Sequence, residues 1–325
     1  MNTMLDMTNE IGIWLSAELD EVSSVMSGHL QNKHPEVNSV CSKLAAYKGK
    51  MLRPSLLLLS WRATADCAVV PKNVVTAAAV VELIHLATLV HDDILDEADI
   101  RRGAQTINSL CGNEAAVILG DYLLSSAFHL CSTIKHVELN ILLGEVTNTL
   151  CAGELVQLSH RNDVDLSLDS YFQIINDKTA SLIAASCEMG SLLGGGDGGI
   201  VSVLRNFGGS VGKAFQIRDD LLDLLAQKID IGKPAGRDLE KGKLTLPVIA
   251  MLAKNPDLKP AVLRAISNHD RDALRKLLLD NGSISSALHE IKKLVDGAVA
   301  GVRGEISNDS SEQLCNLAAQ LKQGI

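Results

Sequence analysis

Short breaks rich in Gly, Pro, Asn and Asp divide this chain into segments of helical length. They lie at His34-Pro35 and at residues 194–199, 228–242, 254–260 and 280–283. Between them, apolar residues recur at the helical period, and no segment shows the convincing alternation of a strand. Because no break is long enough for a clear linker, the pattern predicts one all-helical domain over residues 1–325.

The apolar side chains support the same expectation. Only 3% of the residues are aromatic, although 46% are hydrophobic. Leu, Ala, Val and Ile carry the apolar share, which favours helix packing over a sandwich or a barrel. We therefore expect a globular protein made mostly of helices.

The net charge, the N-terminal sequence and the cysteine content argue against several classes of protein. The net charge is −9 and no block of Lys and Arg suggests a nucleic-acid surface. The N-terminus lacks the features of signal and transit peptides, and no apolar run approaches the ~20 residues that span a bilayer. The absence of such a run still allows peripheral membrane contact. Scattered cysteines without a C-x-x-C pair indicate reduced thiols in a cytoplasmic protein and make zinc improbable. They are Cys41, Cys67, Cys111, Cys131, Cys151, Cys187 and Cys315.

Two copies of the pattern D-D-x-x-D stand in apolar surroundings, in "LVHDDILDEADIRRG" and in "QIRDDLLDLLA". On a helix, the outer acids of each copy lie about one turn apart, where like charges destabilise a bare helix. One copy would suggest a solvated acidic face, but two copies among leucines and isoleucines indicate a polyvalent cation. The acids are Asp92, Asp93, Asp96, Asp219, Asp220 and Asp223.

Carboxylate oxygens favour magnesium or calcium. An EF-hand loop would need alternating Asp and Asn, a central Gly and a closing Glu, and neither segment has them. Magnesium commonly takes one or two carboxylates per ion and completes its shell with water and phosphate oxygens. The sequence therefore predicts a phosphorylated substrate bound through Mg²⁺.

An anionic substrate should also meet cations directly. Lys50 and Arg53 begin an apolar segment, and Arg101 and Arg102 follow the first acidic motif. Each is weak evidence alone, because exposed Lys and Arg are ordinary. His85 lies seven residues before that motif, two turns away on nearly the same helix face. A lone histidine on an apolar face is more often a core residue, but the shared face favours a site.

Together the motifs resemble those of the trans-isoprenyl diphosphate synthases, the polyprenyl synthetase family of all-helical head-to-tail prenyltransferases, and are most like its long-chain members. "GKMLRP" is similar to the family's G-K-x-x-R-P, and "ELIHLATLVHDDILDEADIRRG" and "GKAFQIRDDLLD" resemble its two aspartate-rich helices. "GNEAAVILGDYLL" and "GKPAGRDLEKGKLTLP" match as well. The resemblance covers about residues 43–250, and many members carry a basic residue where this chain has Met51.

The resemblance implies catalytic roles for the six acids and for Lys178. It implies that four of these acids bind magnesium ions that bridge to the allylic diphosphate: Asp92, Asp96, Asp219 and Asp223. For isopentenyl diphosphate it implies Lys50, Arg53, His85 and Arg102. For the allylic diphosphate it implies Arg101, Lys178, Thr179, Gln216 and Lys233. It also implies a homodimer.

The expected product is a long all-trans polyprenyl diphosphate, from hexaprenyl to decaprenyl, with octaprenyl favoured. On a helix, Thr88 falls about one turn below Asp92. The resemblance adds Ala87, because short-chain members carry bulky aromatics at one or both of these positions. Geranylgeranyl or farnesyl diphosphate synthesis is the alternative within the family. A second full acidic motif disfavours a terpene cyclase, and retention of all six acids disfavours a non-catalytic subunit.

Overall fold

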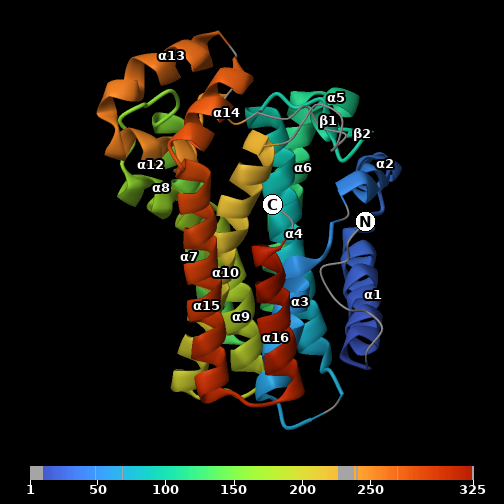
Figure 1. The fold of residues 1–325 in the computed structure, drawn as a ribbon. Helices are drawn as coiled ribbons and strands as arrows, with labels where there is room; N and C mark the ends of the chain where they lie inside the picture. The colour runs from blue at the N-terminus through green and yellow to red at the C-terminus, as the bar shows by residue number, and fades with distance from the viewer. Residues whose placement is uncertain are drawn as a thin grey trace. The chain divides into compact units, whose positions relative to one another are not determined.

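The computed structural model describes residues 10–47, 49–67, 69–225, 238, 241–268 and 270–323. The regular secondary structure of this part of the chain is helical apart from one small hairpin, which confirms the predicted all-α class (Figure 1). The hairpin pairs β1 (Ile100–Arg101) with β2 (Ala104–Gln105). The α-helices are α1 (Glu10–Leu30), α2 (Pro35–Cys41), α3 (Leu52–Thr64), α4 (Lys72–Leu95), α5 (Ile107–Cys111), α6 (Asn113–Ser132), α7 (Val137–Ser159), α8 (Leu168–Ile175), α9 (Ser181–Leu193), α10 (Gly198–Leu225), α12 (Leu246–Lys254), α13 (Lys259–Ser267), α14 (Arg271–Asp280), α15 (Ser283–Glu305) and α16 (Asp309–Ala319). The short helical turns are η1 (Ser42–Tyr47), η2 (Asn176–Ala180), η3 (Pro256–Leu258) and η4 (Gln320–Lys322).

The breaks predicted between helices are confirmed where the structure describes them. Pro35 occupies the first turn of α2, where its fixed φ and missing N–H are tolerated. Gly195 follows α9 with φ +80°, and Gly282 follows α14 with φ +65°. Both adopt the left-handed conformation that ends helices and that glycine takes most easily. Most of the predicted break at residues 228–242 lies outside the described residues.

The chain divides into two compact units. The first unit contains Met1–Thr147, Leu182–Gly208 and Val302–Leu317, and the second contains Asn148–Ser181, Gly209–Gly301 and Ala318–Ile325. The division falls inside α7, α9, α10, α15 and α16. A single domain over residues 1–325 stays a prediction.

Helix α4 is the central element of the first unit, in contact with α1, α3, α5 and α6 (Figure 1). Residues 74–84 are all buried, so this part of the helix is covered on every side. The one acid in that run is Glu82. The packing therefore holds the N-terminal part of α4 in the core and leaves its C-terminal end for polar side chains.

Both α4 and α6 are long and apolar enough, by length and composition, to cross a bilayer. The expectation that no apolar run approaches that length is therefore wrong. In α4, 78% of the most apolar window is buried inside the fold, as in the core helix of a soluble protein. In α6 only 44% of the window is buried, so this helix also carries an exposed apolar face.

In the second unit, α12 packs against α8 and α14, and α13 packs against α14 (Figure 1). A Cβ on Gly153 of α7 would lie 2.7 Å from Asp177 Cβ and 2.9 Å from Lys178 N, so only glycine lets α7 approach the turn η2 this closely. Gly242 has φ +69°, and its carbonyl accepts the N–H of Asn162 at 2.8 Å. Both contacts position segments that line the pocket of this unit.

Candidate active site

The first acidic motif occupies the C-terminal end of α4. Asp92 and Asp93 lie in its last turn, and Asp96 is the C-cap residue, whose N–H donates to Asp92 O at 2.8 Å. The carbonyls at this end of a helix carry partial negative charge. Carboxylates placed there repel one another and the helix end, so the position favours cations.

Asp93, the middle acid, is only 1% exposed, and its charge is balanced within the first unit. Arg101 Nε lies 2.9 Å from Oδ1 and 3.0 Å from Oδ2 of Asp93, and Arg101 Nη2 lies 2.7 Å from Oδ1. The Tyr47 hydroxyl donates to Asp93 Oδ2 at 2.5 Å and accepts the N–H of Ile107 at 3.2 Å. Burial by itself would lower the pKa of Arg101, but Asp93 raises it above its ordinary value. These contacts suit a supporting role for Asp93.

A tight hairpin sends the two consecutive arginines to different partners. Arg101 belongs to β1, whereas Arg102 and Gly103 form the turn with φ +51° and +80°. Positive φ at both central residues is typical of a type I′ turn. Arg102 Nη1 donates to the backbone carbonyl of Tyr47 at 3.0 Å. A Cβ on Gly49 would lie 2.9 Å from Arg102 Nη1, so the glycine of "GKMLRP" leaves room for the guanidinium.

Further from the C-terminal end of α4, Glu82 of this helix is buried, and Arg53 of α3 and His85 of α4 are half-buried. Burial lowers the pKa of Arg53 to about 10, although Glu82 opposes the shift, so Arg53 stays charged at neutral pH. Burial lowers the pKa of His85 well below 6.5, and Arg53, Arg102 and Arg101 lower it further. The imidazole is therefore neutral. Among the described residues, buried Arg53 Nε and Glu82 Oε2 have no hydrogen-bond partner. A bound anion would supply the acceptor that Arg53 lacks.

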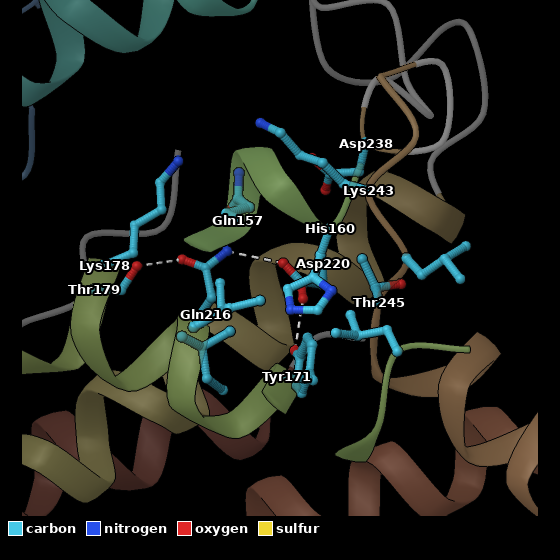
Figure 2. Close-up of a pocket in the computed structure, with 14 residues that line it drawn as sticks. Gln157, His160, Tyr171, Lys178, Thr179, Gln216, Asp220, Asp238, Lys243 and Thr245 are labelled. Carbon is cyan, nitrogen blue, oxygen red and sulfur yellow. Dashed lines mark hydrogen bonds between the residues drawn. The ribbon is translucent and has the colours of Figure 1, made fainter. Parts of the chain in front are cut away.

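The second acidic motif lies near the end of α10, in the second unit. Its middle acid, Asp220, is 6% exposed and accepts hydrogen bonds from Tyr171 OH at 2.6 Å and Gln216 Nε2 at 2.8 Å (Figure 2). Thr179 Oγ1 donates to Gln216 Oε1 at 2.7 Å. Each motif thus has a buried middle acid that a tyrosine hydroxyl holds in place.

A pocket of about 100 Å³ lies along this chain of hydrogen bonds (Figure 2). Lys178 and Thr179 come from η2, a π-helical turn, and such turns frequently mark functional sites. The Lys178 ammonium forms an ion pair with Glu154. The polar lining residues are Gln157, His160, Tyr171, Lys178, Thr179, Gln216, Asp220, Asp238, Lys243 and Thr245.

Burial and like charges raise the pKa of two acids in the pocket. The pKa of Asp220 rises to about 6, through burial first and then through the other acids of its motif, although its two hydrogen bonds oppose the shift. The pKa of Asp238 rises to about 8, through burial first and then through the neighbouring acids, and Lys243 opposes this. A bound cation would reduce the repulsion among these acids.

The carboxylates suit a magnesium ion whose remaining ligands are water and phosphate better than they suit a metal ion held by protein ligands alone. Among the described residues, no three His, Cys, Asp or Glu side chains gather closely enough to hold a metal ion. Magnesium does not need such a group, because it usually takes one or two carboxylates and fills its shell with water and phosphate oxygens. The outer acids of the two motifs are hard oxygen donors of this kind. They are Asp92, Asp96, Asp219 and Asp223.

Comparison with known proteins decides the family. A family model described as polyprenyl synthetase matches residues 34–279, about three quarters of the chain. The chain belongs to the polyprenyl synthetase family.

Individual relatives agree with this assignment. The chain is 36% identical over 250 residues to a prenyl transferase of Cyanophora paradoxa, with 77% of each chain covered. It is 30% identical over 315 residues to the octaprenyl diphosphate synthase of Haemophilus influenzae, with 95% of each chain covered. A polyprenyl synthase of Caulobacter crescentus, solved in complex with calcium and isoprenyl diphosphate, has a TM-score of 0.87 and 31% identity over 95% of each chain. The protein is a prenyl transferase with the all-helical isoprenoid synthase fold.

In this polyprenyl synthetase, the residues predicted from sequence fall into two groups. The first unit holds Lys50, Arg53, His85, Ala87, Thr88, Asp92, Asp93, Asp96, Arg101 and Arg102. The second unit holds Lys178, Thr179, Gln216, Asp219, Asp220 and Asp223. Lys50 is exposed just before α3. Lys233 lies outside the described residues.

The sequence did not single out several residues that the polyprenyl synthetase site contains. Asp238 and Lys243 stand within the matched stretch "GKPAGRDLEKGKLTLP", where an acid beside lysines was the available signal. Tyr171 lies seven residues before Lys178, which is two turns away at helical spacing. No sequence signal pointed to Tyr47, because its role depends on contacts with residues far along the chain.

Asp238→Asn is expected to stabilise the metal-free polyprenyl synthetase near pH 8 and to have little effect near pH 4. The folded pKa of Asp238 is raised to about 8, so the folded chain keeps a proton that the unfolded chain releases above its own, lower pKa. Stability from this group therefore falls as pH rises between those two pKa values. Asparagine removes the penalty, and thermal unfolding with a chelator should show Tm higher by at least about 3 °C near pH 8.

Asp163→Asn provides a control with the opposite sign. The hydrogen bond from His160 lowers the pKa of Asp163, so this acid stabilises the fold above its unfolded pKa and loses that effect as pH falls through its folded pKa. Its replacement should lower Tm near pH 8. An Asp238→Asn variant no more stable than the parent near pH 8 would show that Asp238 is not a buried, destabilising carboxylate.

Proposed function

We propose that this protein joins isopentenyl diphosphate head-to-tail to an allylic diphosphate and repeats the step to make a long all-trans polyprenyl diphosphate. The observation that carries the proposal lies in the first unit. There α4 bears carboxylates at its C-terminal end, and the arginines Arg53 and Arg102 influence the neutral His85 further back on the same helix. Carboxylates can bind a phosphate group through a shared metal ion, whereas arginines bind a phosphate group directly.

Magnesium is the proposed metal. Its proposed protein ligands are Asp92 and Asp96 of the first unit and Asp219 and Asp223 of the second. Bound by these residues, magnesium would stabilise the negative charge that develops on the departing diphosphate. Asp93 and Asp220 support the outer acids from buried positions, where arginine, tyrosine and glutamine side chains hold them.

The cations of the chain bind and orient the two substrates in this proposal. Lys50, Arg53 and Arg102 hold the diphosphate of isopentenyl diphosphate, and neutral His85 donates a hydrogen bond to it. The allylic diphosphate is held by Arg101, Lys178, Thr179, Gln216 and Lys233. These donors stabilise the leaving diphosphate, and holding both substrates together removes the entropy cost of their encounter.

The bond changes need no protein nucleophile. The allylic carbon–oxygen bond breaks, and its electron pair leaves with the diphosphate. The double bond of isopentenyl diphosphate supplies the electron pair of the new carbon–carbon bond. The released diphosphate then takes the proton that restores a double bond. This scheme assigns the protein side chains to binding, orientation and charge stabilisation.

Product analysis tests the proposed function directly. Purified protein is incubated with farnesyl diphosphate, isopentenyl diphosphate and magnesium, and the products are sized by chromatography. We expect products from hexaprenyl to decaprenyl, with octaprenyl the main one, and one diphosphate released per condensation. Geranylgeranyl diphosphate as the final product would contradict the chain length. Conversion of farnesyl diphosphate without isopentenyl diphosphate would indicate a terpene cyclase, and no turnover would indicate a non-catalytic subunit.

Asp92→Asn and Asp219→Asn are each expected to cut turnover by roughly 10² or more, because each removes an anionic ligand of the metal. Circular dichroism should show an intact fold. Asp66→Asn is the matched control, since Asp66 is an exposed acid of the loop between α3 and α4. Near-normal turnover of Asp92→Asn at limiting magnesium would contradict the ligand assignment.

The proposed chain length rests on small side chains next to the first motif. Ala87 is fully buried, whereas Thr88 is half-buried and its hydroxyl donates to the carbonyl of His85 at 2.8 Å. Thr88 precedes Asp92 by one helical turn, so its side chain lies on nearly the same face as that acid. A growing apolar tail that passes this face would meet no bulky side chain at either position.

Thr88→Phe is expected to shorten the product toward geranylgeranyl or farnesyl diphosphate, and the double change of Ala87 and Thr88 to Phe should shorten it at least as much. Phenylalanine at the buried Ala87 position should also cost about 1–3 kcal/mol through overpacking, so the single change is the cleaner test. Thr88→Val removes the hydroxyl without adding bulk and should keep the parent length. Parent-length product from an active Thr88→Phe protein would show that the tail does not pass this face.

A homodimer is the proposed assembly, and the exposed side of α6 is its proposed surface. Ile118 on α6 is 67% exposed, and other large apolar side chains of α5, α6 and the part of α7 in the first unit are exposed as well. They are Leu110, Val117, Phe128, Val137 and Ile141. Exposed apolar patches of this kind mark interaction sites, and a second copy of the same helix can cover one in a two-fold symmetric contact.

Ile118→Glu is expected to convert the dimer into a monomer, because it places a charge in the apolar contact. Light scattering after gel filtration should give twice the 34.7 kDa chain mass for the parent and the single chain mass for the variant. Ile13→Glu on α1 is the control, since Ile13 has a similar exposure of 61%. A monomeric parent would contradict the assembly, and a dimeric Ile118→Glu protein would contradict the surface.

We also propose a cytoplasmic location, with peripheral membrane contact when the apolar product leaves. None of the seven cysteines, which all lie in the described part of the chain, forms a disulfide. Free thiols are typical of reducing compartments. A long polyprenyl chain has little solubility in water, so its release is favoured at a lipid surface.

A further inference from the structure

Tyr47 contacts residues assigned to both diphosphates. It is the last residue of η1 and is 1% exposed. Its hydroxyl donates to Asp93 at 2.5 Å and accepts the N–H of Ile107 at 3.2 Å. Its backbone carbonyl accepts Arg102 Nη1 at 3.0 Å, and the guanidinium carbon of Arg101 lies 5.9 Å from its ring centroid. The Tyr47 side chain thus contacts the first acidic motif, Ile107 and Arg101, whereas its backbone carbonyl holds Arg102.

We propose that Tyr47 is a positioning residue that couples the isopentenyl diphosphate site to the binding of the metal-bound allylic diphosphate. The proposal rests on the proposed function, which supplies the two substrates. Tyr47 touches neither of them. It acts through Asp93 and Arg101 on one side and through Arg102 on the other.

Packing alone does not account for this tyrosine. A phenylalanine would fill the same volume, whereas a buried hydroxyl is costly unless it forms hydrogen bonds. Here the hydroxyl serves as donor and acceptor at once. Burial and the neighbouring Asp93 raise the pKa of Tyr47 above its ordinary value, so the hydroxyl keeps the proton that it donates.

Loss of the hydroxyl should disturb both arginines together. Asp93 Oδ2 would lose its shortest hydrogen bond, and the buried carboxylate that orients Arg101 would become less fixed. Ile107 N–H, at the start of α5, would lose its acceptor. Arg101 and Arg102 are consecutive residues of one tight hairpin, so a shift of one is carried to the other.

Tyr47→Phe tests the proposal by calorimetry rather than by turnover. Isopentenyl diphosphate is titrated in the presence of a chelator, and farnesyl thiolodiphosphate is titrated with magnesium. We expect both Kd values to rise about fivefold or more, the size that one lost hydrogen bond gives. Lys50→Ala, which removes a direct ligand, should raise only the Kd for isopentenyl diphosphate.

Tyr122→Phe is the matched control. Tyr122 lies in the same unit, and its hydroxyl accepts only a long 3.4 Å hydrogen bond from Asn32, so its removal should leave both Kd values unchanged. A double change tests the route. If Tyr47 acts through Asp93, then Tyr47→Phe on an Asp93→Asn background should weaken farnesyl thiolodiphosphate binding by much less than fivefold.

The outcomes separate this proposal from the one on which it rests. A lower Tm with both Kd values unchanged would show a purely structural role for Tyr47, and a change in only one Kd would show that it does not couple the sites. Either result overturns the proposal while the proposed function stands. If the parent protein binds neither diphosphate, the proposed function fails and the role of Tyr47 fails with it.

Discussion

Carboxylates at the C-terminal end of a buried helix are the constraint on which the first unit depends. Residues 74–84 of α4 are buried, so the helix cannot shift to relieve repulsion among the acids that follow. The partial negative charge of the helix end adds to that repulsion. Two contacts stabilise Asp93 against this repulsion. Arg101 of the hairpin β1–β2 forms an ion pair with Asp93, and the Tyr47 hydroxyl donates a hydrogen bond to it. A cation that arrives with the substrate would further reduce the repulsion among the outer acids.

In both motifs the buried middle acid is held by hydrogen bonds, but the donors differ. Tyr47 and Arg101 hold Asp93, and Tyr171 and Gln216 hold Asp220. A full positive charge balances the first middle acid, whereas neutral donors serve the second, whose pKa is raised to about 6 by burial and by its acidic neighbours. Within each motif, the middle acid is thus fixed by the fold. The outer acids are the natural ligands for a metal that arrives with phosphate.

Local chemistry made much of the fold predictable. Proline and glycine at the helix ends, and the helical period of Leu, Ala, Val and Ile, act within a few residues, so the breaks beside Pro35, Gly195 and Gly282 could be read from the sequence. The acids of α4 and α10 were predictable for the same reason. Even so, the structure adds that Asp93 and Asp220 are buried, which spacing alone could not show.

Contacts between distant segments were not predictable. Tyr47 and Ile107 are sixty residues apart, and Tyr171 and Asp220 are forty-nine apart, so no local pattern signals either pair. The left-handed Gly242 beside Asn162, and the raised pKa of Asp238, likewise depend on tertiary packing. The prediction that no apolar segment approaches the length of a membrane span was also wrong for α4. Only the fold shows that most of this helix is buried.

In the proposed site, the acids bind one diphosphate through metal while the arginines bind the other directly. Titration of the parent protein with each substrate, with magnesium and then with a chelator, tests it most directly. We expect the affinity for farnesyl thiolodiphosphate to fall by about 10² or more without metal, whereas the affinity for isopentenyl diphosphate should change by less than about threefold. Equal loss of both affinities, or metal-independent binding of both, would contradict it.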